Sequence, residues 1–101
     1  MFLIALALLA EPPPDLTDPY NHAVAIWASC ARTSVGNAAA QSRRRDAGLV
    51  DNALRDCRPT EDALRIYLRG QFTSEEAERR VSEIRGEIRR SLTRSLRRLR
   101  R

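Results

Sequence analysis

Cys30 and Cys57 are the residues of this 101-residue chain whose type and spacing point to covalent chemistry. Cys30 lies 14 residues before Arg44, and Cys57 lies 13 residues after it. Two antiparallel helices joined near Arg44 would bring both cysteines to the same height, within about one residue rise of 1.5 Å. The spacing therefore predicts a disulfide, because the two Cα atoms can approach the roughly 5.5 to 6 Å that the bond requires. Two unconnected buried thiols are the alternative.

The remaining nucleophiles, carboxylates and metal ligands form no recognisable pattern. His22 is the only histidine, whereas a tetrahedral zinc site needs a closely spaced set of cysteines and histidines. Asp46, Asp51 and Asp56 recur every five residues, which scatters them around a helix instead of pairing two carboxylates. The nearby hydroxyls lie a turn or more from His22, so no catalytic triad is indicated. We therefore expect no catalytic activity, no bound metal and no cofactor.

Arginine is the other residue type with functional potential. All 18 basic residues are arginine, and the net charge is +5. Abundant alanine and the absence of lysine are typical of a GC-rich genome, so the position of the charge is more informative than its amount. Residues 1–72 carry eight arginines and eight acids, whereas residues 73–101 carry ten arginines and five acids. The candidate contacts to an anion or a partner are Arg85, Arg89, Arg90, Arg94, Arg97 and Arg98.

The start of the chain has the pattern of an export signal. Residues 2–10 are nine apolar residues, which is the length of a secretory core and far below the roughly 20 residues that span a bilayer. The alternative is a buried or disordered apolar start, because no arginine or lysine precedes this run. We predict a signal-like leader (1–10), a proline-rich linker (11–18) and a single helical domain (19–101). An oxidising, periplasmic location in a bacterium agrees with the predicted disulfide.

The first helix is predicted from Pro19 to about Gln41. Asp18 followed by Pro19 is an N-cap followed by proline at the first helical position. Apolar and small residues then recur every three or four positions, with Trp27 on the stripe. We expect Trp27 to anchor the core and not to form an exposed binding site.

A second helix and a restart are predicted after a turn at residues 42–45. Asp46 is the expected cap of the second helix, which carries Cys57 on its apolar face. Pro59 then produces either a kink or a break, and the spacing does not decide between them. Gly70 is expected to close the segment.

The clearest helical pattern covers residues 73–99. The run that begins at Thr73 forms a capping box, in which Glu76 is expected to reach back. The apolar stripe continues to Leu99 and would pack on the hairpin, on a second copy or on a membrane: Ala77, Val81, Ile84, Ile88, Leu92, Leu96 and Leu99. We also expect ion pairs between Glu75 and Arg79, and between Glu76 and Arg80, at spacing i,i+4.

The sequence thus predicts an all-α protein, with a short hairpin of two to three helices followed by a long amphipathic, basic C-terminal helix. The expected function is non-catalytic interaction, in which this helix contacts a protein partner or a second copy. One alternative is peripheral binding of the arginine-rich helix to an anionic lipid surface. Nucleic-acid binding applies only if the protein is not exported. A solvated basic face without a partner is the remaining alternative.

Overall fold

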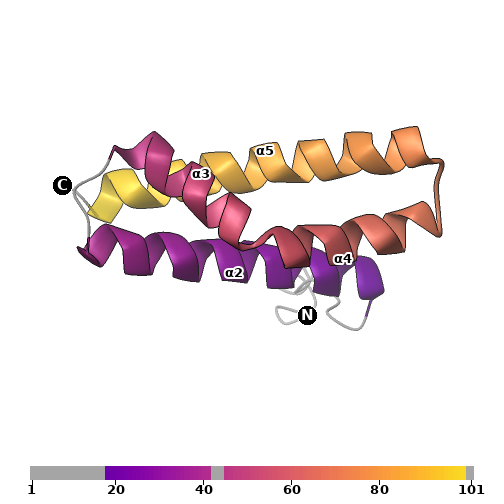
Figure 1. Ribbon diagram of the computed structural model, residues 1–101, viewed down its shortest axis with the longest axis horizontal. Coiled ribbons are helices and arrows are strands. Elements are labelled where there is room, and N and C mark those ends of the chain that lie inside the picture. Colours follow the sequence, from indigo (N-terminus) through magenta and orange to yellow (C-terminus); the bar gives the residue numbers. More distant parts are fainter. Residues whose placement is uncertain (1–17, 42–44, 100–101) are drawn as a thin grey trace, which may run out of the picture.

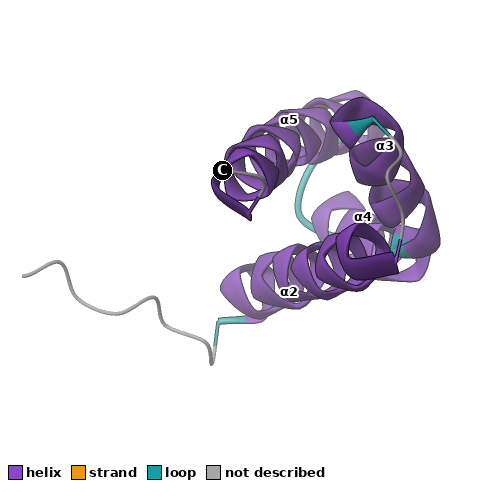
Figure 2. Ribbon diagram, turned by 90° about the vertical axis from the view of Figure 1, so that its left-hand side faces the viewer, coloured by secondary structure: helices purple, strands orange, loops and turns teal. Residues whose placement is uncertain are grey.

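The computed structural model describes residues 18–41 and 45–99, which form four α-helices. These are α2 (Pro19–Gln41), α3 (Asp46–Asp56), α4 (Arg58–Arg69) and α5 (Ser74–Leu99). Helix α2 runs in one direction, α3 and α4 return along it, and α5 runs back beside them (Figure 1). Seen nearly end-on, the α3–α4 segment lies to one side of α2 and α5, and each of the three contacts the other two (Figure 2). The all-α prediction is confirmed, whereas the predicted leader and all but the last residue of the linker lie outside the described residues.

The first helix begins and ends where the sequence predicts. The backbone N–H of Tyr20 donates to Asp18 Oδ1 at 3.1 Å, which satisfies one of the free amides of the first turn. Pro19 follows at the first helical position, where its missing N–H removes no helical hydrogen bond. The last residue of α2 is Gln41.

The segment around Pro59 is a true break and not a kink. Helix α3 ends at Asp56 and α4 begins at Arg58, so Cys57 alone separates them. The carbonyl of Cys57 accepts from the amides of Thr60 (3.1 Å) and Glu61 (3.2 Å), which starts the new helix. Proline in the first turn is tolerated there because that turn has free amides in any case.

Two predicted helix caps differ from the structure. Asp46 is the first residue of α3, so the N-cap position belongs to Arg45, whose side chain makes no capping hydrogen bond. The amide of Glu76 donates to Thr73 Oγ1 at 3.2 Å, as the capping box predicts. The Glu76 carboxylate, however, accepts from Arg79 and Arg80, because two guanidinium groups attract it more strongly than a neutral amide.

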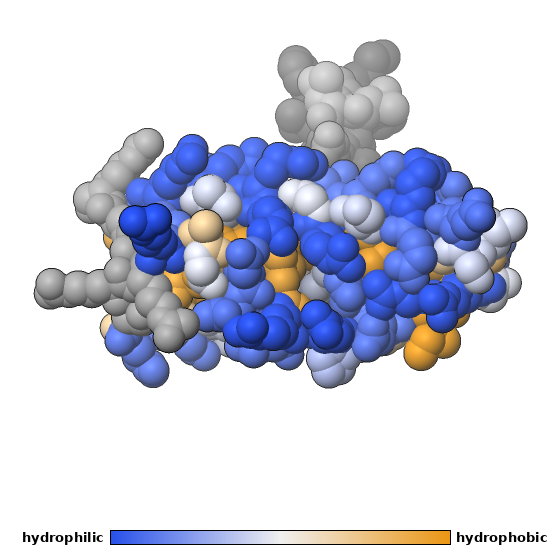
Figure 3. Space-filling model, turned by 45° about the horizontal axis from the view of Figure 1, so that its top comes forward, coloured by the Kyte–Doolittle hydropathy of each residue, from blue (hydrophilic) through white to orange (hydrophobic). Residues whose placement is uncertain are grey.

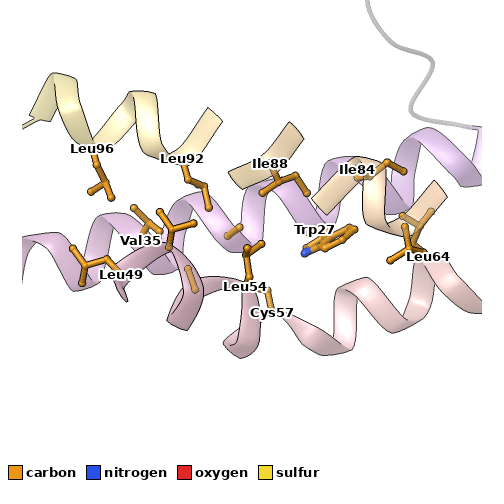
Figure 4. Close-up of a cluster of buried hydrophobic side chains, with 14 of the residues drawn as sticks. Trp27, Val35, Leu49, Leu54, Cys57, Leu64, Ile84, Ile88, Leu92 and Leu96 are labelled. Atoms are coloured by element: carbon orange, nitrogen blue, oxygen red, sulfur yellow. The ribbon is translucent and has the colours of Figure 1, made fainter. Parts of the chain in front are cut away.

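Trp27 lies at the centre of the core, fully buried, as predicted (Figure 4). The core draws buried side chains from every helix. Besides Trp27, the largest fully buried side chains are Leu49, Val50, Cys57, Leu64, Leu68, Val81, Leu92 and Leu96. Among the described residues, the indole Nε1 of Trp27 is the buried side-chain nitrogen without a hydrogen-bond partner. Its burial is therefore stabilised by packing of the ring and opposed by the cost of desolvating its N–H group.

The disulfide between Cys30 and Cys57 is present, with Cα atoms 6.0 Å apart, and the prediction is confirmed. It joins the middle of α2 to the single residue between α3 and α4. Because it closes a separation of 27 residues, the loop-entropy model assigns it about 3.5 kcal/mol of stabilisation. The cross-link therefore fixes the break between α3 and α4 at one height along α2.

Candidate functional site

Helix α5 changes character halfway along its length. Residues 74–87 carry five acids and three arginines, whereas residues 88–99 carry five arginines and no acid. This order suits the helix dipole, which favours negative charge at the N-terminus and positive charge at the C-terminus. The face formed by α5 and α3 is correspondingly dominated by hydrophilic side chains (Figure 3). The C-terminal half of α5 is therefore the strongest candidate for a functional surface.

Two of the six predicted contact arginines face the α3–α4 segment and are already paired. Arg85 donates to Glu61 Oε1 from Nε (2.8 Å) and from Nη2 (2.6 Å). Arg89 forms an ion pair with Asp51 of α3. These contacts join α5 to both α3 and α4, so Arg85 and Arg89 act at least as links between helices.

Glu61 is the buried acid of this helix contact, with 8% of its surface exposed. Its second oxygen accepts from Arg65 Nη2 at 3.3 Å, so both carboxylate oxygens have partners. Arg65 also donates from Nε to Glu78 of α5 at 2.6 Å. The hydrogen bond to Glu78 raises the pKa of the Arg65 guanidinium, and the same bond lowers the pKa of Glu78 below its usual range.

The other four predicted arginines are exposed, and no ion pair joins any of them to the described residues: Arg90, Arg94, Arg97 and Arg98. Arg90, Arg94 and Arg97 follow at spacings of four and three, which places them on one stripe of the helix. Because no acid occurs on α5 after Glu87, their charges are not neutralised along the helix. These arginines can meet an external carboxylate or phosphate in a two-point contact.

The apolar stripe of the same half helix is not part of this surface. Leu92 and Leu96 are 1% and 0% exposed, and Ile88 is 7% exposed, because they pack into the intramolecular core. Leu99 alone of the stripe is open to solvent, at 67% exposure. Of the three predicted packing partners of the stripe, the hairpin is therefore the one observed.

The basic end of α5 lies beside the start of α3 (Figure 1). Arg45, which precedes α3 directly, is exposed at this end. The described part of this end therefore carries arginine from two separate elements, which concentrates positive potential there.

At the opposite end of the molecule, the arginines of α5 are engaged by an aromatic ring and by ion pairs. Arg80 lies over the ring of Phe72, with its guanidinium carbon 4.1 Å from the ring centroid. Arg79 pairs with Glu76 and Glu83, not with Glu75 as predicted, whereas the predicted pair of Arg80 with Glu76 is present at 3.1 Å. The Glu76 carboxylate accepts hydrogen bonds from Arg79 and Arg80, and the bond from Arg79 is the main reason that its pKa is lowered.

His22 is exposed on α2, and no group of three or more histidines, cysteines or acids in the described ranges could hold a metal ion. No helix of the described chain has the length and hydrophobicity to cross a membrane.

Sequence reasoning missed Glu61, Arg55 and Arg58, which lie near Arg85 and Arg89. The sequence signal for Arg55 and Arg58 is their spacing from Asp51, at i+4 and i+7, which would place these three residues on one face of a continuous helix. The break at Pro59 concealed this signal.

The chain was compared with protein-family models, with curated proteins and with solved structures, and none of the three comparisons found a match.

Proposed function

We propose that this is an exported, non-catalytic interaction protein that binds an acidic protein partner through the exposed arginines of the C-terminal half of α5. The surface consists of Arg90, Arg94, Arg97 and Arg98, which we call the α5 arginine surface. The observation that supports the proposal is that these four guanidinium groups are exposed and unpaired within the described residues, while the apolar residues of the same half helix are buried.

This combination favours charge recognition over apolar docking. An amphipathic helix binds a lipid interface by burying its apolar face, but Leu92 and Leu96 already lie in the core. Pairing of the stripe with a second copy would likewise require α5 to leave the bundle. A partner that presents carboxylates can bind the arginines with α5 in place.

The disulfide supports the exported location. Cys30 and Cys57 form a disulfide. Disulfides persist in proteins of oxidising compartments and are rare in proteins of reducing ones.

The test is photo-crosslinking in the native host from a photoreactive residue placed at Leu99, which is exposed beside the arginines. The variant changes Arg90, Arg94, Arg97 and Arg98 to Gln. The matched control changes Arg32, Arg69, Arg79 and Arg80 to Gln, which removes the same charge from other parts of the surface. We expect one acidic protein to be crosslinked in the wild type and in the control and lost in the variant, with an affinity reduced about tenfold or more at low salt.

Three results would reject the proposal. The first is equal binding of the identified partner by the variant and the wild type. The second is that no protein is crosslinked while the wild type, but not the variant, cosediments with anionic vesicles, which would support the lipid alternative. The third is recovery of the protein from the cytoplasm with residues 1–10 retained and with salt-dependent binding to DNA.

A further inference from the structure

A charged hollow lies between α5 and the break that separates α3 from α4. Its volume is about 320 Å³, and Leu54, which is 8% exposed, contributes to its wall. The charged side chains that line it are four arginines and two acids: Arg55, Arg58, Arg85, Arg89, Asp51 and Glu61. The hollow therefore has an excess of two positive charges.

Two of the arginines are held in position by the acids. Glu61 binds Arg85 through two contacts, and Asp51 forms an ion pair with Arg89. A guanidinium group whose position is already fixed loses less conformational freedom when it binds an anion. The α5 side of the hollow is thus preorganised.

The other two arginines lie on the opposite side of the hollow and carry its surplus charge. Arg55 donates to the amide oxygen of Asn52, which is neutral. Arg58 is exposed and forms no ion pair with a described residue. The negative end of α3 and the positive end of α4 meet at the break, so the two helix dipoles oppose each other there and the surplus charge comes from the side chains.

A purely structural role explains only half of this arrangement. Joining α5 to α3 and α4 requires Arg85, Arg89 and their two acids. It requires neither Arg55 nor Arg58, which bring two further positive charges to the same hollow at a cost in mutual repulsion. An anion in the hollow would remove that repulsion.

We propose that this hollow binds a phosphoryl group carrying two negative charges, either as inorganic phosphate or as the phosphomonoester head of a lipid. The planar fork of arginine matches phosphate oxygens in two-point contacts, and the arginines reach the hollow from two opposite sides. The charge of such a group equals the surplus charge of the hollow, whereas a single carboxylate would neutralise half of it. The site uses none of the α5 arginine surface, so it can be present or absent independently of the acidic protein partner.

The first experiment measures binding of inorganic phosphate to the full-length oxidised protein by calorimetry and by the thermal midpoint, with chloride at equal ionic strength as reference. The variant is Arg55→Gln with Arg58→Gln, which leaves both ion pairs of α5 intact. The matched control is Arg32→Gln with Arg45→Gln, which removes the same charge from two exposed arginines that lie outside both the hollow and the α5 arginine surface. We expect saturable binding and a rise in the midpoint for the wild type and the control, and at least a tenfold loss of affinity for the variant.

The second experiment distinguishes the two sources of the phosphoryl group. Vesicles that contain phosphatidic acid are compared with vesicles that contain phosphatidylglycerol, whose phosphodiester carries one negative charge. Preference for phosphatidic acid, lost on addition of inorganic phosphate and in the Arg55/Arg58 variant, assigns the site to a lipid head. Binding of inorganic phosphate without such a preference assigns it to the free anion.

Circular dichroism of the variant establishes that it remains folded, which is expected because both side chains are exposed. The proposal is overturned if chloride reproduces the effect of phosphate at equal ionic strength. It is also overturned if the folded Arg55/Arg58 variant binds phosphate as tightly as the wild type does.

Discussion

Helices α2 and α5 cover the same core with opposite compositions. Helix α2 has 23 residues, of which Arg32 is the only one that carries a full charge at neutral pH, with His22 counted as neutral. Helix α5 has 26 residues, of which 13 are arginine or glutamate. Both helices contribute fully buried side chains, among them Trp27 and Leu92. Because both helices contribute to one core, the difference between them lies in the additional interactions that attach each helix to the rest of the protein.

Helix α2 is held by apolar burial and by a covalent bond, whereas α5 is held by apolar burial and by ion pairs. The disulfide fixes α2 against the break between α3 and α4. Ion pairs from Glu61 and Asp51 fix α5 against the same segment. Because these acids engage only part of the charge of α5, the rest remains available for recognition. Under the proposed function, the more charged helix adds recognition to its structural role, while the less charged helix is mainly structural.

The largest effect is expected from truncating the apolar anchor of α2. Trp27→Ala removes a fully buried ring and should lower the free energy of unfolding by about 3–5 kcal/mol. Leu92→Ala is the matched change on α5, with an expected loss of about 2–5 kcal/mol. Urea unfolding measures both. Trp27→Phe is the control, because it retains most of the ring and removes the unpartnered N–H. A loss as large as that of Trp27→Ala would contradict the assignment of the stabilisation to packing of the ring.

Removing the covalent bond should produce the next largest effect. Changing Cys30 and Cys57 together to Ala should lower the free energy of unfolding by about 2–4 kcal/mol, since the loop constraint on the unfolded chain is lost. Thermal unfolding with and without reductant measures this loss. Reductant should lower the midpoint of the wild type and leave that of the variant unchanged. An unchanged wild type in reductant would contradict the assigned role of the disulfide.

A smaller effect, in this case an increase in stability, is expected from replacing a glycine of α5. Gly86 has no positive φ, and an added Cβ would meet Arg90 Nη1 at 3.5 Å, an ordinary contact. Gly86→Ala should therefore raise the free energy of unfolding by about 0.5–1 kcal/mol through helix propensity. Gly36→Ala is the matched change on α2, where an added Cβ meets no atom within 4 Å. Chemical denaturation compares the two. If Gly86→Ala lowers the free energy of unfolding and Gly36→Ala does not, the position of the Arg90 side chain matters for stability.

The smallest effect should come from an exposed ion pair of α5 and should be confined to acid. The hydrogen bond from Arg65 lowers the pKa of Glu78 below the ordinary value of 4.5. A carboxyl with a depressed folded pKa stabilises the protein above its unfolded pKa, and this stabilisation is lost as the pH falls through the folded pKa. Glu78→Gln should therefore lower the thermal midpoint at pH 7, and the difference from the wild type should close below about pH 4.

Glu75→Gln is the control for this titration, because Glu75 is exposed and forms no ion pair with a described residue. Thermal midpoints of the three proteins between pH 7 and pH 2 provide the measurement. If the thermal midpoints of Glu78→Gln and the wild type differ by the same amount over this whole pH range, the ion pair is excluded as the cause of the difference.

Local patterns predicted most of the helices because their causes lie within a few residues. The capping contact of Asp18, the amide contact of Thr73 and the apolar periodicity of α5 are all short-range features. The predictions that failed concern choices between neighbours. Asp46 became the first helical residue instead of the cap, and Arg79 paired with Glu76 and Glu83 instead of Glu75. These alternatives differ by a few tenths of a kcal/mol, so local spacing alone does not resolve them.

The candidate sites were only partly predictable for a different reason. The list of six arginines on α5 follows from the sequence, but their division into paired and unpaired groups depends on acids far along the chain. Arg85 and Glu61 are 24 residues apart, and Arg89 and Asp51 are 38 residues apart. No periodicity connects such positions.

The sequence alone determined the all-α class, the extent of α2 and α5, and the pairing of Cys30 with Cys57, because helix periodicity converts spacing into height along an axis. The tertiary structure alone decided that Pro59 separates two helices, that the apolar stripe of α5 faces the hairpin, and which arginines remain unpaired. The physical reason is that Coulomb attraction and burial depend on distances between helices, and packing sets those distances.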